Sequence, residues 1–308
     1  MTSTAAPPVP APSRPAPAAR RPRRKWRGWL FVAPFMLVFA LTFIAPVVYA
    51  FVLSLYRDQA FFGGTVFVGA DNYLQVFGDP KFWDAFRRVL VFLAVQVPIM
   101  LALALVAALA IDSARLHGAG FFRIVIFLPY AVPAVVAALM WGFIYGDHFG
   151  LAADLNHLFG TSVKPLSENW LLTSIGNIVT WEFVGYNMLI FYSALKVIPK
   201  ELFEAAAIDG AGTFRTIRSV KLPAIRGAIV VATIFSIIGS FQLFNEPNIM
   251  RNLVPNMIVT NYTPNMYAYN LSFNGQQYNY SAAVAIVMGV ITAVIAYVVQ
   301  LRGSRKEM

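Results

Sequence analysis

The sequence predicts an all-α integral membrane protein, and three observations support this fold class. Of its 308 residues, 58% are hydrophobic and only 12% are charged, roughly half the charged fraction of a typical soluble domain. The chain has no cysteine, which excludes disulfides, thiolate nucleophiles and cysteine-bound metals. Six apolar runs are each long enough for a membrane-spanning helix, which needs about 20 residues. These predicted spans are 29–55, 89–111, 121–145, 171–195, 227–246 and 281–301.

The first span is preceded by residues 1–28, which are rich in Pro, Ala and Arg and are expected to form a disordered basic tail. A cleaved signal peptide is the alternative for this end, but the apolar run that follows is too long for one. The RRPRRK cluster most simply anchors the topology, with contact to anionic membrane lipid as a secondary role. We expect residues 29–303 to form the transmembrane domain and 304–308 a cytoplasmic tail.

The distribution of lysine and arginine predicts that both termini are cytoplasmic. With the N-terminus inside, 18 basic residues fall on the inner side of the membrane and 6 on the outer side, as the positive-inside rule requires. The net charge of +10 is therefore divided among loops beside helices, so no nucleic-acid partner is expected.

Three outer segments, 57–88, 146–170 and 247–280, connect the predicted spans, and none is long enough for a typical folded domain. The last contains MIVTNYTPNMYAYNLSFNGQQYNY, whose Asn, Gln and Tyr side chains suit a polar neutral ligand or a docking protein. An ordinary capped loop is an equally good interpretation.

Enzymatic motifs are absent. The sequence has no G-x-x-x-x-G-K-[ST], no H-E-x-x-H and no G-x-S-x-G. His148 and His157 lie near Asp147 and Asp154, which is a weak basis for a metal site. We therefore expect no catalytic residue, no metal and no cofactor in this chain.

Polar groups inside the predicted spans are the candidates for a substrate pathway, because such groups are costly in a membrane. Glu182 lies in the fourth span and shares a helix face with Tyr186. In the fifth span, SFQLFNEPNI is expected to place Gln242, Asn245 and Glu246 on one helix face. Measured from the loop between the spans, Glu182 and Gln242 lie at matching depths of about 20 and 22 Å. Amides and aromatic rings suit a sugar as the substrate of this pathway. Two other roles for these polar groups stay open, hydrogen bonding between helices and an ion relay through Glu182.

The loop 198–225 interrupts the apolar pattern between the fourth and fifth spans. Pro199 suits the first turn of a helix over 200–209, and Gly210 fits the position just beyond its end. Thr213 is expected to cap a second short helix that ends before Pro223. A short amphipathic helix at the cytoplasmic surface can dock into a groove of a partner; the alternative is a helix that lies passively on lipid.

Residues 204–223, EAAAIDGAGTFRTIRSVKLP, resemble the EAA loop of binding-protein-dependent ABC transporter permeases. Residues 27–303, including FVGADNY, LPYAVPAVV and FQLFNEPNI, are similar to the sugar-importing branch, which contains the maltose and glycerol-phosphate permeases. The residues that match the loop motif are Glu204, Ala205, Ala206, Asp209, Gly210, Ala211, Val220, Leu222 and Pro223.

The resemblance implies a six-helix bundle of the ABC importer permease type, with 204–210 as a cytoplasmic coupling helix seated in an ATPase cleft. It implies four further subunits: a second homologous permease, two ATPase subunits that bind ATP and magnesium, and an extracytoplasmic sugar-binding protein. It also implies that the sugar pathway is lined by Tyr186, Asn187, Gln242 and Asn245. Whether Glu182 and Glu246 contact substrate or only neighbouring helices stays open.

We therefore interpret the chain as a permease subunit of an ATP-driven importer of a di- or oligosaccharide in a bacterial plasma membrane. Three alternatives stay open at this point: an ion-coupled secondary sugar transporter, a related permease for another polar solute such as glycerol phosphate, and a membrane scaffold. The extra N-terminal spans and the large external domain of the maltose permease have no counterpart in this sequence.

Overall fold

The computed structural model describes residues 26–59, 64–113, 116–147 and 150–304, which are mostly helical. The chain divides into two units, Met1–Val48 and Tyr49–Met308. The first contains α1 (Trp26–Phe39), the π-helical turn η1 (Ala40–Ile44) and the start of α2 (Ala45–Ser54). Residues 1–25 and 305–308, which hold most of the two predicted tails, lie outside the described residues. The first helix begins at Trp26, inside the tail predicted to be disordered, because a helix propagates readily into adjoining residues once formed.

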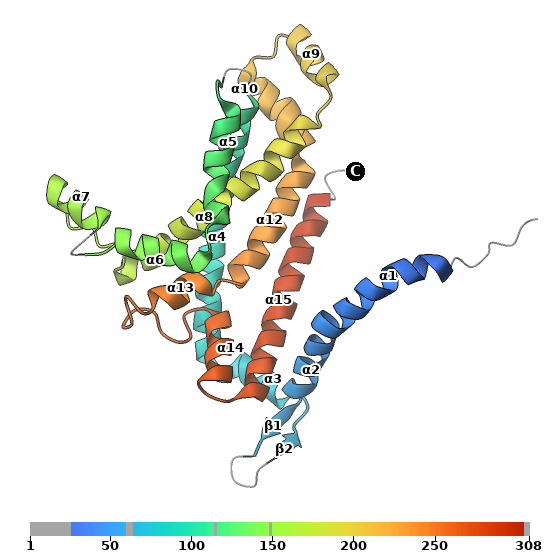
Figure 1. The fold of residues 1–308 in the computed structure, drawn as a ribbon, viewed down its shortest axis with the longest axis vertical. Helices are drawn as coiled ribbons and strands as arrows, with labels where there is room; N and C mark the ends of the chain where they lie inside the picture. Colours follow the sequence, from blue (N-terminus) through green and yellow to red (C-terminus); the bar gives the residue numbers. More distant parts are fainter. Residues whose placement is uncertain (1–25, 60–63, 114–115, 148–149, 305–308) are drawn as a thin grey trace, which may run out of the picture. The chain divides into compact units, whose positions relative to one another are not determined.

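The second unit contains four long helices, shown in cyan, yellow-green, orange and red in Figure 1. They are α4 (Pro80–Asp112), α8 (Glu168–Lys196), α12 (Arg226–Phe241) and α15 (Tyr278–Ser304). With the N-terminal helix, the described residues contain five helices long and apolar enough to cross a membrane, or six if one bent pair is a single span. The prediction of an all-α membrane protein is confirmed.

The second span is longer than hydrophobicity alone predicts. α4 starts at Pro80, not near residue 89, because Pro80 occupies the first helical turn and the Asp79 carboxylate accepts a hydrogen bond of 2.9 Å from the Lys81 backbone N–H. These capping groups begin the helix before its apolar run does. Along its length α4 then supplies buried side chains to three hydrophobic clusters, among them Phe82, Phe92 and Ala104.

The third predicted span, 121–145, is not one continuous helix, so the prediction was wrong in shape. It consists of α5 (Ala119–Phe127), the 3₁₀ turn η2 (Leu128–Ala131) and α6 (Ala134–Ile144), with a bend of 98° between the two halves. Val132 is extended, with ψ of 128°, because Pro133 disfavours a helical conformation in the residue before it. α7 (Leu151–Phe159) follows α6.

The fifth predicted span, 227–246, is also interrupted. α12 ends at Phe241 and α13 (Asn245–Met250) begins after a break. Pro247 has no N–H and its ring would clash with the carbonyl group four residues earlier, that of Leu243. That carbonyl instead accepts a hydrogen bond of 2.9 Å from the Thr263 hydroxyl. Gln242 therefore does not share one helix face with Asn245 and Glu246, contrary to the prediction.

Two π-helical turns each end two residues before a proline. η1 precedes Pro46, and η3 (Ile217–Lys221) precedes Pro223. In each case the π-helical turn contains the residue four positions before the proline, whose carbonyl group would clash with the proline ring in a regular α-helix. The wider turn accommodates that carbonyl group, so the helix continues past the proline. The second helix of the polar loop therefore runs on through α11 (Leu222–Ala224), and the prediction that it ends before Pro223 was wrong. No side chain caps its start, where α10 (Thr213–Thr216) has Gly212 at the capping position.

Within the second unit, different elements lie at the two ends of the long helices (Figure 1). One end carries α9 (Lys200–Ile208) and α10. The other carries the antiparallel strands β1 (Tyr56–Asp58) and β2 (Thr65–Phe67), α3 (Asp71–Gly78) and α14 (Pro264–Phe273).

A hydrogen-bond cluster joins α4, α14 and α15 at this second end. The hydroxyls of Tyr267 and Tyr280 both donate to Oδ2 of Asp79, at 2.5 and 2.8 Å. Burial alone would raise the pKa of Asp79, but these hydrogen bonds and that from the Lys81 N–H outweigh it and hold the pKa below its ordinary value. The ionised carboxylate therefore stabilises the fold at pH values above the ordinary carboxyl pKa. This contribution to stability is lost as the pH falls through the lowered pKa.

We expect Asp79→Asn to lower the free energy of unfolding at pH 7 by about 1.5–3 kcal/mol, since charge-assisted hydrogen bonds are lost. The loss should shrink as the pH falls below about 4, the ordinary aspartate pKa, and disappear once the native carboxylate is protonated at a still lower pH. Thermal unfolding in detergent at both pH values measures this effect. Asp71→Asn, in the exposed first turn of α3, is the control. Equal melting of Asp79→Asn and wild type at pH 7 would contradict the prediction.

Candidate functional site

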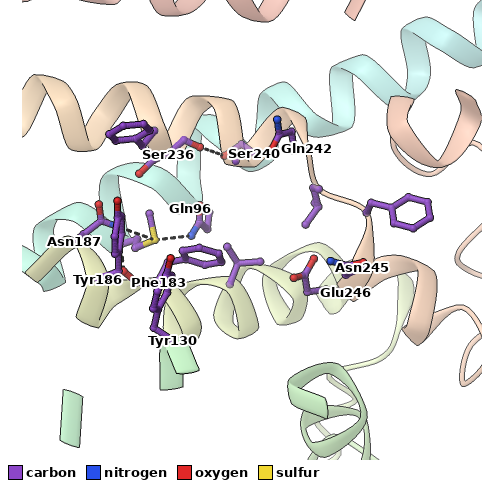
Figure 2. Close-up of a pocket in the computed structure, with 16 residues that line it drawn as sticks. Gln96, Tyr130, Phe183, Tyr186, Asn187, Ser236, Ser240, Gln242, Asn245 and Glu246 are labelled. Atoms are coloured by element: carbon purple, nitrogen blue, oxygen red, sulfur yellow. Dashed lines mark hydrogen bonds between the residues drawn. The ribbon is translucent and has the colours of Figure 1, made fainter. Parts of the chain in front are cut away.

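A cavity of about 360 Å³ lies between α4, α8 and α12 (Figure 2). Four parts of the chain line it: α4, η2, α8, and the region from α12 to the start of α13. The lining residues are Gln96, Met100, Tyr130, Val179, Phe183, Tyr186, Asn187, Phe235, Ser236, Gly239, Ser240, Gln242, Leu243, Phe244, Asn245 and Glu246.

The break between α12 and α13 shapes one wall of this cavity. All five residues from Gln242 to Glu246 line it, which a continuous helix could not achieve because its side chains point in all directions around the axis. Gln242 is the C-terminal capping residue of α12, and Glu246 lies in the first turn of α13. The irregular backbone therefore brings the polar side chains together that the sequence had assigned to one helix face.

Five of the six residues predicted for the substrate pathway line the cavity: Tyr186, Asn187, Gln242, Asn245 and Glu246. The sixth, Glu182, is not among the lining residues. Its Oε2 atom is buried with no hydrogen-bond partner among the described residues. Glu182 and Glu246 are both buried, 4% and 7% exposed.

The polar side chains of the cavity retain unused hydrogen-bonding capacity. The Asn187 amide donates to the Phe183 carbonyl oxygen at 3.0 Å, but its own Oδ1 is buried without a partner among the described residues. The Gln96 amide donates at 3.3 Å to the Thr180 hydroxyl. An unsatisfied buried acceptor is costly, so Oδ1 of Asn187 is well suited to a ligand hydroxyl.

Aromatic rings form another wall. Tyr130 stacks on Tyr186, with ring centroids 4.9 Å apart and 17° between the planes, and meets Phe183 edge to face at 5.7 Å. Figure 2 shows these rings across the cavity from α12. Such faces can pack against the apolar face of a ring-shaped ligand.

Sequence reasoning missed four polar residues of the cavity: Gln96, Tyr130, Ser236 and Ser240. Gln96 is a polar residue in the middle of an apolar run, so the criterion that selected Glu182 would have found it as well. Tyr130 carries no such signal, because its position depends on the 3₁₀ turn η2 and on the bend that follows.

The polar loop forms the helix that its sequence predicts. α9 ends at Ile208, one residue before the predicted end, and Gly210 follows with φ of 68°, a left-handed conformation that favours glycine. Of the motif residues, Glu204, Ala205, Asp209 and Gly210 are exposed, while Leu222 and Pro223 are half-buried. Large apolar side chains are exposed beside them, Ile208 at 87% and Phe214 at 78%. This surface can receive a partner.

Of the metal site considered for His148 and His157, His148 lies outside the described residues. Within the described part of the chain, no group of three or more His, Cys, Asp and Glu side chains could hold a metal ion.

Comparisons with known proteins agree with this geometry. The family described as "Binding-protein-dependent transport system inner membrane component" matches residues 100–304. The lactose transport system permease protein LacF of Rhizobium radiobacter is 33% identical over 226 residues, which cover 71% of this chain and 74% of LacF. The diacetylchitobiose uptake system permease protein NgcF of Streptomyces coelicolor is 34% identical over 272 residues, 80% of this chain and 75% of NgcF.

A solved structure has a similar fold. One chain in the crystal structure of a bacterial ABC transporter involved in the import of the acidic polysaccharide alginate matches with a TM-score of 0.76. The match covers 92% of this chain and 96% of that chain at 19% sequence identity.

Proposed function

The chain belongs to the family of binding-protein-dependent transport system inner membrane components, and we propose that it forms half of the translocation pathway of an ATP-driven importer for a neutral di- or oligosaccharide. Membership makes it a multi-pass inner-membrane permease subunit that is not itself an ATPase. This rules against the ion-coupled transporter and scaffold alternatives. The observation that carries the sugar assignment is the cavity, with its amide groups, aromatic faces and unpartnered acceptor.

The charge of the cavity argues for a neutral solute. None of the described residues that line it is a lysine or an arginine, and Glu246 is among them. A phosphate group needs positively charged or densely packed N–H donors, so glycerol phosphate fits this lining poorly. The volume of the cavity falls within the range of about 300–1,000 Å³ that is usual for small-molecule sites. Two of the permeases that share about a third of their aligned residues with this chain are named for lactose and diacetylchitobiose, both disaccharides.

Each predicted pathway residue has a role in this proposal. Tyr186, stacked on Tyr130, packs against a sugar ring. Asn187, Gln242 and Asn245 exchange hydrogen bonds with sugar hydroxyls. Glu246 contacts the sugar, while Glu182, which is buried but does not line the cavity, supports its wall from behind.

The remaining subunits follow from the coupling loop. We assign α9 and Gly210, with Glu204, Ala205, Ala206, Asp209, Leu222 and Pro223, to the contact with a cytoplasmic ATPase that binds ATP and magnesium. This assignment places the end of the molecule that carries α9 in the cytoplasm, together with both termini, as the positive-inside distribution predicts. A second permease completes the pathway, and a sugar-binding protein docks at the opposite end. Residues 29–303 form the transmembrane domain in this proposal.

Alternating access fits the broken helices. Helices that are interrupted at a binding site allow the segments on either side to move separately, as in other transporters. The bend between η2 and α6 and the break between α12 and α13 both lie at the cavity. ATP binding by the ATPase, transmitted through the coupling loop, then shifts the inner segments and opens the cavity toward the binding protein.

Uptake by proteoliposomes tests the proposed function. The complex of this permease with its partner subunits should take up at least one of lactose, maltose and diacetylchitobiose with ATP, but not glycerol 3-phosphate. Tyr186→Ala and Gln242→Ala should each reduce the transport rate by about tenfold, the equivalent of 1.4 kcal/mol, while leaving assembly intact. Tyr297→Ala, which removes an exposed aromatic side chain of α15 at 60%, is the control. Uptake of glycerol 3-phosphate alone would overturn the sugar assignment, and unchanged rates would reduce both residues to structural roles.

A further inference from the structure

An ion-pair cluster lies where the coupling loop meets the long helices. Asp112, the last residue of α4, binds two lysines: Oδ1 lies 2.9 Å from Nζ of Lys196 at the end of α8, and Oδ2 lies 2.6 Å from Nζ of Lys221 in η3. The side chains of Asp112 and Lys221 are largely buried, 11% and 15% exposed. A single carboxylate therefore joins two long helices to the coupling loop.

This cluster extends in both directions through cation–π contacts. Toward the loop, Nζ of Lys221 lies 5.7 Å from the ring centroid of Phe203 in α9. Toward the bundle, Nζ of Lys196 lies 5.1 Å from the ring of Tyr192, and the guanidinium of Arg123 in α5 lies 5.7 Å from the same ring. The coupling helix α9 is thus connected to α5 by an unbroken series of contacts.

From α5 the connection reaches the cavity. α5 passes directly into η2, whose Tyr130 stacks on Tyr186 in the cavity wall. α5 also packs closely against α8. The two helices are so close at Gly185 that a side chain there would overlap the Ile126 carbonyl group. A movement of η3 relative to α4 is therefore transmitted to the segment that carries Tyr130, provided that the Asp112 cluster stays intact.

We propose that Asp112 is a positioning residue that transmits movement of the coupling loop to the substrate cavity, through Lys221 on one side and Lys196, Tyr192 and Arg123 on the other. This inference rests on the proposed function, since it needs an ATPase acting on α9. Asp112 itself touches neither substrate nor nucleotide. A buried ion pair that loses one partner leaves an uncompensated charge, so the cluster favours the arrangement in which all three groups meet.

The absence of native cysteine allows a direct readout. Ser236→Cys places one thiol in the cavity wall on α12. In proteoliposomes that contain the permease with its ATPase and partner permease subunits, the rate of thiol modification by a water-soluble methanethiosulfonate reagent is measured with and without ATP. The parent Ser236→Cys protein should change its modification rate when ATP is added, which reports the movement of the cavity.

Asp112→Asn should reduce this ATP-dependent change at least about fivefold, the lower end of typical coupling between sites, while the complex still assembles and hydrolyses ATP. Lys221→Gln should have the same effect, because the Asp112–Lys221 pair is the link to the coupling loop. The double variant should be no worse than Asp112→Asn alone, because Lys221→Gln removes a pair that Asp112→Asn has already removed. Asp112→Glu and Lys221→Arg, which keep the charges, should retain the response. Asp84→Asn, in the exposed Asp84–Arg87 pair at 3.8 Å, is the matched control and should leave it unchanged.

The outcomes separate the inference from its premise. If the parent protein shows no ATP-dependent change at all, the proposed function fails and the inference fails with it. If the parent responds and Asp112→Asn responds equally, or if the two single variants add in the double variant, only the role of Asp112 is overturned. Should Asp112→Asn fail to assemble, Lys221→Gln decides the question, because it preserves the pair of Asp112 with Lys196.

Discussion

We expect Glu204→Lys to abolish ATP-driven uptake while leaving the permease inserted and folded. Glu204 is exposed on α9, and glutamate and lysine have similar helix propensities, so the helix itself should persist. In the proposed function this carboxylate meets polar or basic groups of the ATPase. Reversal of its charge should weaken attachment of the ATPase by about 2–5 kcal/mol, the usual cost of disrupting a charged pair in an interface.

Co-purification of the ATPase and sugar uptake in proteoliposomes measure this effect together. Glu168→Lys makes the same change in the exposed first turn of α8, at the opposite end of that helix from the coupling loop, and should leave attachment of the ATPase unchanged. Glu204→Gln should lie between wild type and Glu204→Lys. Normal uptake by Glu204→Lys would remove the coupling assignment for the whole loop, including that of Gly210, for which Gly210→Pro should be equally damaging.

The second large effect is expected for Gly185→Ala, which should destabilise the permease by about 3 kcal/mol, the upper end of overpacking costs. A Cβ at this position of α8 would overlap the carbonyl oxygen of Ile126 and lie 2.6 Å from Cα of Phe127. Both are backbone atoms of α5, so no side-chain rotation relieves the clash and α5 must move away. Small residues at helix contacts in membranes serve this close approach. Tyr130 would then leave its place in the cavity wall.

Thermal unfolding in detergent and the yield of assembled complex test this prediction. Gly289→Ala in α15 is the control, because no atom lies within 4 Å of its added Cβ and alanine favours a helix interior over glycine. A Gly185→Ala variant that melts at the wild-type temperature would mean that α5 and α8 pack less closely than the structure has them.

Some features of the coupling loop were accessible to sequence reasoning because they depend on neighbouring residues. Hydrogen bonds in a helix join residues four apart, and Gly210 is selected by its own φ angle. The bounds of α9 therefore followed closely from the sequence. The function of Glu204 and of the other loop residues stays a prediction, since it depends on a subunit outside this chain.

The two spans that are interrupted share one cause. Hydropathy identifies a long apolar run but is insensitive to proline, and Pro133 and Pro247 each break a run that hydropathy treats as continuous. The rule that a proline displaces the carbonyl group four residues earlier would have located the break at Leu243. Whether such a segment bends by 98° or only kinks is decided by what packs around it.

The sequence by itself determined that the chain is a helical membrane protein, where its long apolar segments lie, and which loop resembles a coupling helix. Hydrophobic runs, caps and short motifs act over a few residues, so they can be read along the chain. Only the tertiary structure decided that Gln96 and Tyr130 join Asn187 and Gln242 around one cavity, and that Asp112 meets Lys221 across 109 positions of sequence. These contacts depend on helix breaks and on which faces pack together, and packing arises between residues that the sequence keeps far apart.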